Sequence, residues 1–101
     1  MRLNITIETF SQKYELALDD ELNKAKFNGK LINCDITDLK LNILALIKSW
    51  PEKLVNTNIV DGIKYKVLYK NGNANKTYIS INKLPNNFSE FYKLITSCDK
   101  G

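Results

Sequence analysis

Two stretches in which apolar residues recur at every second position, both in the second half of the chain, constrain its fold most strongly. The first runs from Ile63 to Lys70 and the second from Thr77 to Ile81, with the Asn/Gly-rich segment 71–75 between them. A period of two residues is that of a half-buried strand, so the pattern predicts a β-hairpin. We expect residue 70 to pair with residue 76, which puts 65 opposite 81, 67 opposite 79 and 69 opposite 77.

This register makes one face of the hairpin apolar and leaves the other rich in lysine. The second face presents four lysines around a cross-strand pair of Leu68 and Tyr78. This Lys/Tyr face consists of Lys64, Lys66, Leu68, Lys70, Lys76 and Tyr78. An amphipathic tyrosine ringed by ammonium groups suits an acidic protein surface or a phosphate backbone, so this face is the first choice for partner binding.

A central helix is predicted before the hairpin, from Thr37 to Trp50. Apolar residues cover most of its circumference, which indicates a helix buried on more than one side, with Trp50 in the core. Asp35 or Thr37 can accept hydrogen bonds from the first free backbone amides, and Pro51 ends the helix.

A closing helix is predicted after the hairpin, from Asn87 to Ser97. Asn87 and Glu90 have the spacing of a capping box, in which Asn87 caps the helix and Glu90 reaches back. One face of this helix is apolar and mostly aromatic, and it consists of Phe88, Phe91, Tyr92 and Ile95.

The N-terminal segment predicts two further strands. Residues 3–7 and 14–18 show the same alternation, so we expect an antiparallel pair joined near residues 9–12. Its solvent face and the residues that follow it form a local acidic surface, consisting of Glu8, Glu15, Asp19, Asp20 and Glu21. Carboxylates can occupy the basic cleft of a nuclease and mimic phosphate, so this surface is the second choice for partner binding.

The segment from Asp20 to Phe27 permits two interpretations. It can form a short helix that Asn28-Gly29 ends in left-handed conformation, or the same Asn-Gly can be a type I′ turn between strands 25–27 and 30–32. The helix is the preferred interpretation here.

Together these elements predict an α+β fold, a small antiparallel sheet packed on one face by a central and a C-terminal helix. A length of 101 residues with 44% hydrophobic and 26% charged residues fits a single globular domain spanning residues 1–101. No apolar run approaches the roughly 20 residues of a membrane span, and no signal peptide is evident. Cys34 and Cys98 lack C-x-x-C spacing, so free thiols and a cytoplasmic location are expected.

The sequence carries no recognisable catalytic residue set. Histidine is absent, which removes the commonest general base and metal ligand, and neither a P-loop nor a G-x-G-x-x-G motif occurs. Asp61-Gly62 is best explained as the tight turn that starts a strand. We therefore expect no enzyme activity, no cofactor and no bound metal.

The second half of the chain contains the series Trp50-Pro51, Asn58 to Gly62 with Tyr65, Tyr78, and the segment from Asn82 to Phe91. This series, within about residues 43 to 95, resembles a pattern in small bacterial immunity proteins of contact-dependent growth inhibition and related toxin systems. The resemblance implies a cytosolic protein that binds and neutralises a cognate toxin domain, with a nuclease as the expected kind, by occluding its active site or an adjacent surface. The net charge of +4 departs from the acidic character common among inhibitors of basic nucleases.

Two other functions fit the residues. A nucleic-acid-binding protein would use the Lys/Tyr face, and its affinity would fall steeply with salt. A self-associating regulatory protein would instead pair an edge strand or the Leu68–Tyr78 patch with a second copy.

Overall fold

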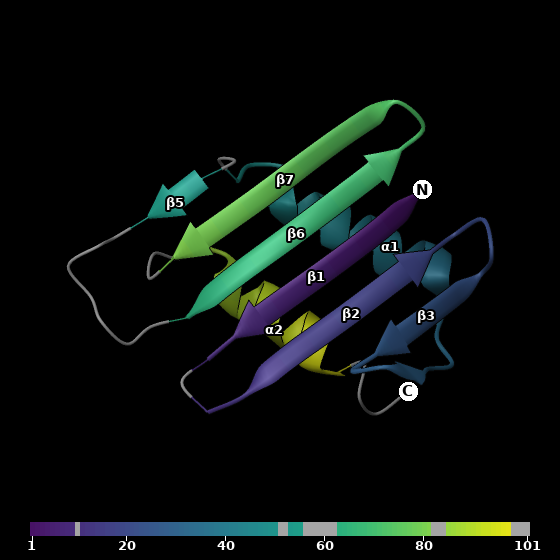
Figure 1. Ribbon diagram of the computed structural model, residues 1–101, viewed down its shortest axis with the longest axis horizontal. Coiled ribbons are helices and arrows are strands. Elements are labelled where there is room, and N and C mark those ends of the chain that lie inside the picture. The colour runs from purple at the N-terminus through teal and green to yellow at the C-terminus, as the bar shows by residue number, and fades with distance from the viewer. Residues whose placement is uncertain (10, 51–52, 56–62, 82–84, 98–101) are drawn as a thin grey trace.

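The computed structural model describes residues 1–9, 11–50, 53–55, 63–81 and 85–97. In these residues the chain forms seven strands and two helices (Figure 1). They are β1 (Arg2–Glu8), β2 (Lys13–Asp19), β3 (Lys24–Phe27), β4 (Lys30–Leu31), α1 (Ile36–Ile47), β5 (Lys53–Val55), β6 (Lys64–Asn71), β7 (Ala74–Ile81) and α2 (Phe88–Ser97).

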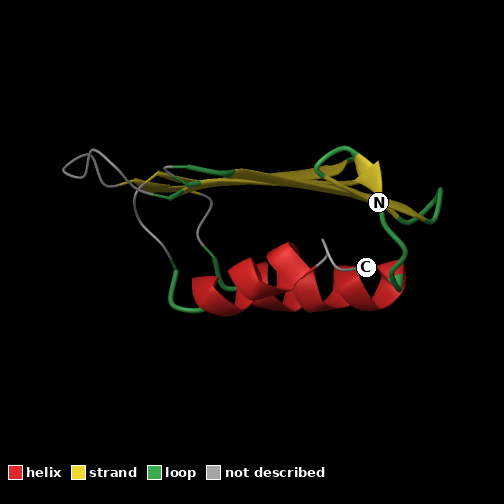
Figure 2. Cartoon of the chain, turned by 90° about the horizontal axis from the view of Figure 1, so that it is seen from below, coloured by secondary structure: helices red, strands yellow, loops and turns green. Residues whose placement is uncertain are grey.

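All the described strands belong to one sheet, in the order β4-β3-β2-β1-β6-β7-β5. Every neighbouring pair is antiparallel except β5 and β7, which run parallel. Both helices pack beneath the same side of the sheet, and no described element covers the other side (Figure 2). We call these sides the helix-covered face and the open face, and this two-layer arrangement confirms the predicted α+β fold.

The core lies between the sheet and the helices. On β1, Leu3, Ile5 and Ile7 are at most 1% exposed, because β1 is central and its alternate residues all point toward the helices. The helices contribute buried residues to the same layer, among them Ile43 of α1 and Phe91 of α2. Aliphatic side chains from the sheet centre and aromatic ones from α2 thus share a single apolar layer.

The predicted N-terminal strand pair is confirmed. β1 and β2 pair along their whole length, from Arg2 opposite Asp19 to Glu8 opposite Lys13. The connection is closed by a hydrogen bond from the Thr9 amide to the Gln12 carbonyl, at 2.8 Å.

The preferred helix over residues 20–27 is wrong, and the hairpin interpretation is confirmed. β3 pairs with both β2 and β4, and Asn28 and Gly29 link β3 to β4. Their φ angles are 51° and 84°, the left-handed conformation that a type I′ turn needs at both central residues. The turn chemistry and the alternation of Lys24 to Phe27 outweigh helix propensity here.

The register of the β6–β7 hairpin differs from the prediction by one residue. Lys70 pairs with Asn75, not with residue 76, so only Gly72 and Asn73 remain in the loop. Gly72 has a φ of 60° as the first of these two residues, which is the pattern of a type II′ turn. This tight turn, whose twist matches that of the flanking strands, fixes the pairing.

The one-residue shift turns every side chain of β7 to the opposite face from the one predicted. Tyr78 and Ser80 face the helices and are buried, whereas Ile79 and Ile81 lie on the open face and are each 37% exposed. The Leu68–Tyr78 pair therefore does not exist. Leu68 lies opposite Thr77, and Tyr78 lies opposite Val67.

The central helix is shorter and less buried than predicted. Asp35 caps α1, since its carboxylate accepts a hydrogen bond from the Asp38 amide at 3.0 Å, but the helix ends at Ile47 and not at Trp50. Part of α1 packs in the core, whereas Leu41 is 58% exposed. α1 packs on the sheet and against α2 (Figure 2), so it is buried on more than one side as predicted, although part of its apolar surface stays exposed.

Trp50 lies in the core as predicted and joins the two helices. Its ring packs on Tyr65 and Phe91, with centroid distances of 4.8 and 4.7 Å. Its Nε1 donates a hydrogen bond of 2.6 Å to the Asn87 side chain, whose Nδ2 donates one of 2.7 Å to the Leu46 carbonyl. Asn87 precedes α2 as predicted, but its side chain connects α2 to the end of α1 in place of the predicted capping box.

Several expectations concern residues outside the described ones. These are the stop at Pro51, the turn at Asp61-Gly62, the segment Asn82 to Leu84 and the thiol of Cys98. Cys34 is a free, half-buried cysteine, and burial raises the pKa of its thiol.

We predict that Asn87→Ala destabilises the fold by about 2 to 4 kcal/mol, because it leaves the Trp50 indole N–H and the Leu46 carbonyl without a partner at a partly buried site. Urea denaturation measures the change. Asn86→Ala, an exposed neighbour, is the matched control and should alter stability by less than about 0.5 kcal/mol. Equal stability of the two variants would contradict the role of Asn87.

Candidate functional site

The structure divides the predicted Lys/Tyr face between the two sides of the sheet. Lys64, Lys66, Leu68 and Lys70 of β6 lie on the open face, where the sequence places them. Tyr78 is 8% exposed on the helix-covered face, and Lys76 lies on that same side, opposite Tyr69. The predicted residues therefore form no single site.

Among the side chains that the structure describes, the open face carries the whole positive excess. Strand pairing and alternation place seven basic and three acidic residues on it. The basic residues are Arg2, Lys13, Lys24, Lys26, Lys64, Lys66 and Lys70, and the acidic ones are Glu8, Glu15 and Asp19. The other side chains that the structure describes comprise five basic and five acidic residues, so the positive excess of the described side chains resides on this face.

The acidic residues of the open face are neutralised by neighbouring cations. Lys13 lies 3.9 Å from the Glu8 carboxylate and 3.1 Å from that of Glu15, and Arg2 Nε lies 3.3 Å from an Asp19 oxygen. The five other basic residues, all lysines of β3 and β6, make no ion pair with any described residue. The central strands β1 and β2 are therefore close to neutral, with free ammonium groups on either side.

Apolar side chains are exposed at two diagonally opposite corners of the open face. Leu22 and Leu31, 60% and 67% exposed, border a shallow depression of about 500 Å³ that also touches Lys24 and Lys26. Ile79 and Ile81 border a second one of about 260 Å³, whose other walls include Lys64, Lys66, Thr6 and Glu8. Four of the five large hydrophobic residues that are exposed among those described thus lie at the rim of this face, each pair beside lysines.

The described aromatic side chains of the strands all lie on the helix-covered face. The others belong to α2 or, in the case of Trp50, follow the end of α1. In full, the described aromatic residues are Tyr14, Phe27, Trp50, Tyr65, Tyr69, Tyr78, Phe88, Phe91 and Tyr92. In the described part of the chain, the open face therefore offers aliphatic and cationic groups but no ring on which a base could stack.

Burial raises the pKa of Tyr65 to about 12, partly opposed by a contact with Ser80, so its phenol stays protonated at neutral pH.

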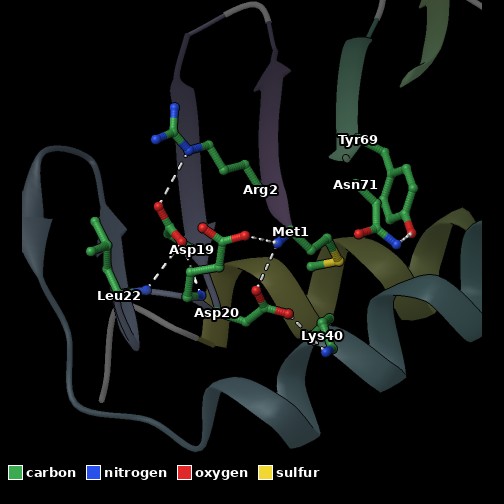
Figure 3. A network of polar contacts seen from close by, with 9 residues as sticks. Met1, Arg2, Asp19, Asp20, Leu22, Lys40, Tyr69 and Asn71 are labelled. Carbon is green, nitrogen blue, oxygen red and sulfur yellow. Dashed lines mark hydrogen bonds and ion pairs between the residues drawn. The ribbon is translucent and has the colours of Figure 1, made fainter. Parts of the chain in front are cut away.

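Asp20, from the second-choice acidic surface, joins the sheet to α1. Its Oδ1 accepts from the Met1 ammonium at 2.8 Å and its Oδ2 from Lys40 Nζ at 3.0 Å (Figure 3). Glu21 lies 3.7 Å from the same ammonium group. Hydrogen bonds from the ammonium group and from Lys40 hold the pKa of the Asp20 carboxyl below its usual value, although burial opposes this shift.

The five residues of the predicted acidic surface therefore each lie within 4 Å of a positively charged group. They form ion pairs, of which only that of Asp20 with Lys40 reaches α1, and they do not present a block of free carboxylates.

Sequence reasoning did not identify Leu22, Lys24, Lys26 and Leu31 as part of a site. The available signal was the alternation of polar and apolar residues from Lys24 to Phe27, just before Asn28-Gly29. This alternation places Lys24 and Lys26 on the open face only if the segment is a strand.

Comparison of the chain with protein-family models, with curated proteins and with solved structures finds no match. Among the described residues, neither helix has the length and apolar character needed to cross a membrane.

We predict that Asp20→Asn lowers stability at neutral pH and that the deficit disappears in acid. Because the pKa of Asp20 in the fold lies below its ordinary value of 3.8, its carboxylate stabilises the fold above pH 3.8. That contribution is lost as the pH falls through the lower, folded-state pKa.

Urea denaturation at pH values from 7 down to 2 measures this difference between the parent and the variant. Glu21→Gln is the matched control, since the Glu21 side chain is 82% exposed and its contribution should be negligible at every pH. A deficit for Asp20→Asn that persists at pH 2 would show that the substitution acts through packing and not through charge.

Proposed function

We propose that this chain is a non-catalytic binding protein of the immunity kind, which neutralises a cognate toxin domain by covering it with the open face of its sheet. The observation that carries the proposal is the concentration of the positive excess of the described side chains, together with two pairs of exposed Leu and Ile residues, on the one face that no described element covers. The resemblance of the second half to immunity proteins supports the same function. Such a role needs no catalytic group.

The composition of this face favours an acidic protein surface as its partner. Aliphatic side chains at the two corners can enter apolar pockets and exclude water, and the lysines beside them steer association and set orientation. The toxin surface that is covered would then be an acidic region next to the active site. A cleft that binds phosphate would itself be basic and would repel these lysines.

Nucleic acid is the second candidate, because five lysines of the open face have no ion-pair partner among the described residues. Proteins that bind single strands on a sheet use exposed aromatic rings for stacking, and each base–ring stack contributes about 1 to 3 kcal/mol. The described part of this face has no aromatic ring.

Self-association through a patch of Leu68 and Tyr78 is not supported, since Tyr78 is buried on the other side of the sheet.

We predict that the gene immediately upstream encodes a large secreted protein with a C-terminal toxin domain, and that expression of this chain restores growth of cells that produce that domain. The double variant Lys64→Glu/Lys66→Glu should lose protection and weaken binding of the purified toxin domain tenfold or more, because it reverses two charges beside the Ile79–Ile81 corner. Isothermal titration calorimetry measures the binding.

The matched control is Lys30→Glu/Lys93→Glu, which changes net charge equally at exposed positions away from the open face. It should protect fully. Continued killing despite soluble expression of the parent chain would refute the immunity function. Retention of RNA or DNA by the parent at physiological salt, lost in the Lys64→Glu/Lys66→Glu variant, would assign the open face to nucleic acid.

A further inference from the structure

A cleft lies on the other side of the sheet, between α1 and the β6–β7 hairpin. It has a volume of about 340 Å³ and is lined by Leu44, Ile47, Lys48, Tyr69, Lys76 and Tyr78. Its walls are mainly apolar, since Ile47 and Tyr78 belong to the core while Leu44 and Tyr69 are half-buried against it. The cleft is separate from the open face and has no part in the function proposed above.

Two lysines from different elements border this cleft. Lys48 follows the last turn of α1, and Lys76 lies on β7. Both are exposed, and neither makes an ion pair with a described residue. An apolar cleft with two free ammonium groups at its rim complements a ligand that combines an apolar side chain with carboxylate.

The neighbouring edge of β7 is free over half its length. β5 pairs only with Ile79 to Ile81, so no described strand pairs with the outer edge of Ala74 to Tyr78 (Figure 1). Such an edge presents unpaired backbone N–H and C=O groups and can accept one more strand. Lys76 lies in this free segment, and its ammonium group repels a cation on an added strand and attracts an acidic residue at the position beside it.

We propose that the free edge of β7 and this cleft together bind an extended acidic peptide segment of a partner protein. The segment adds to the sheet as a strand beside Ala74 to Tyr78. On the side facing α1, an acidic residue lies beside Lys76, and an apolar residue two positions away lies beside Tyr78 and enters the cleft. Lys48 contacts a carboxylate of the same segment from the opposite wall.

The probe is a fluorescein-labelled ten-residue peptide in which aspartate and leucine alternate on one face of the extended chain and threonine fills the other. Fluorescence polarisation should show saturable binding. The peptide with lysine in place of aspartate should bind at least tenfold more weakly. The variant Lys48→Glu/Lys76→Glu should weaken binding of the aspartate peptide at least tenfold, with Lys30→Glu/Lys93→Glu as the control of equal charge that leaves it unchanged.

Two peptides, each N-methylated at one of the two alternating sets of amides, test strand addition. Methylation of one set should abolish binding and methylation of the other should leave it intact, because only alternate amides of an added strand face the edge of β7.

Four outcomes would each overturn the proposal. They are no binding below millimolar concentration, equal binding of the lysine peptide, insensitivity to Lys48→Glu/Lys76→Glu, and equal behaviour of the two methylated peptides. Displacement of the peptide by decanoate at equal affinity would also overturn it, in favour of a site for small carboxylates. Lys64→Glu/Lys66→Glu should not affect this binding.

Discussion

The apolar contact between one side of the sheet and the two helices determines which face of the sheet each described strand residue lies on. Side chains alternate along a strand, so once Leu3, Ile5 and Ile7 of β1 turn toward the helices, Asn4, Thr6 and Glu8 must turn away. The pairing registers carry this choice across the sheet from β1 to its neighbours. The charged open face is therefore a direct consequence of core formation beneath the sheet.

The same contact explains why none of the described aromatic residues lies on the open face. The gap between the sheet and the helices is filled by large rings, including Trp50, Tyr65 and Phe91, which pack at angles and carry few polar atoms. One hydrogen-bonded group, the Asn87 side chain, satisfies the indole of Trp50 within this layer. The surface that is left for recognition is accordingly built from lysine stems, short aliphatic side chains and paired carboxylates.

Much of the fold could be predicted from local patterns, and the errors occur where two patterns compete. The strands over residues 2–19 and the apolar face of α2 were predictable, because each segment fits only one periodic pattern of apolar residues. In β7, Thr77, Ile79 and Ile81 look like the buried set, but the tight turn at Gly72 decides the register and buries Tyr78. The candidate site has the same error, since its β6 lysines lie on the predicted face of the sheet and its β7 residues lie on the other. The approach of Lys48 to Lys76 depends on how α1 lies across the sheet, which no local pattern contains.

The central position of β1 has a consequence for how the chain folds. β1 is the first strand in the sequence, yet it pairs with β6, whose residues follow it by more than half the length of the chain. During synthesis at roughly 5 to 20 residues per second, β1 and β2 can pair early. The other edge of β1 stays unpaired for several more seconds, until β6 has been synthesised. The β1–β6 seam is also a non-local contact, of the kind that slows folding. The seam therefore joins an N-terminal and a C-terminal wing, and neither wing alone holds a complete core.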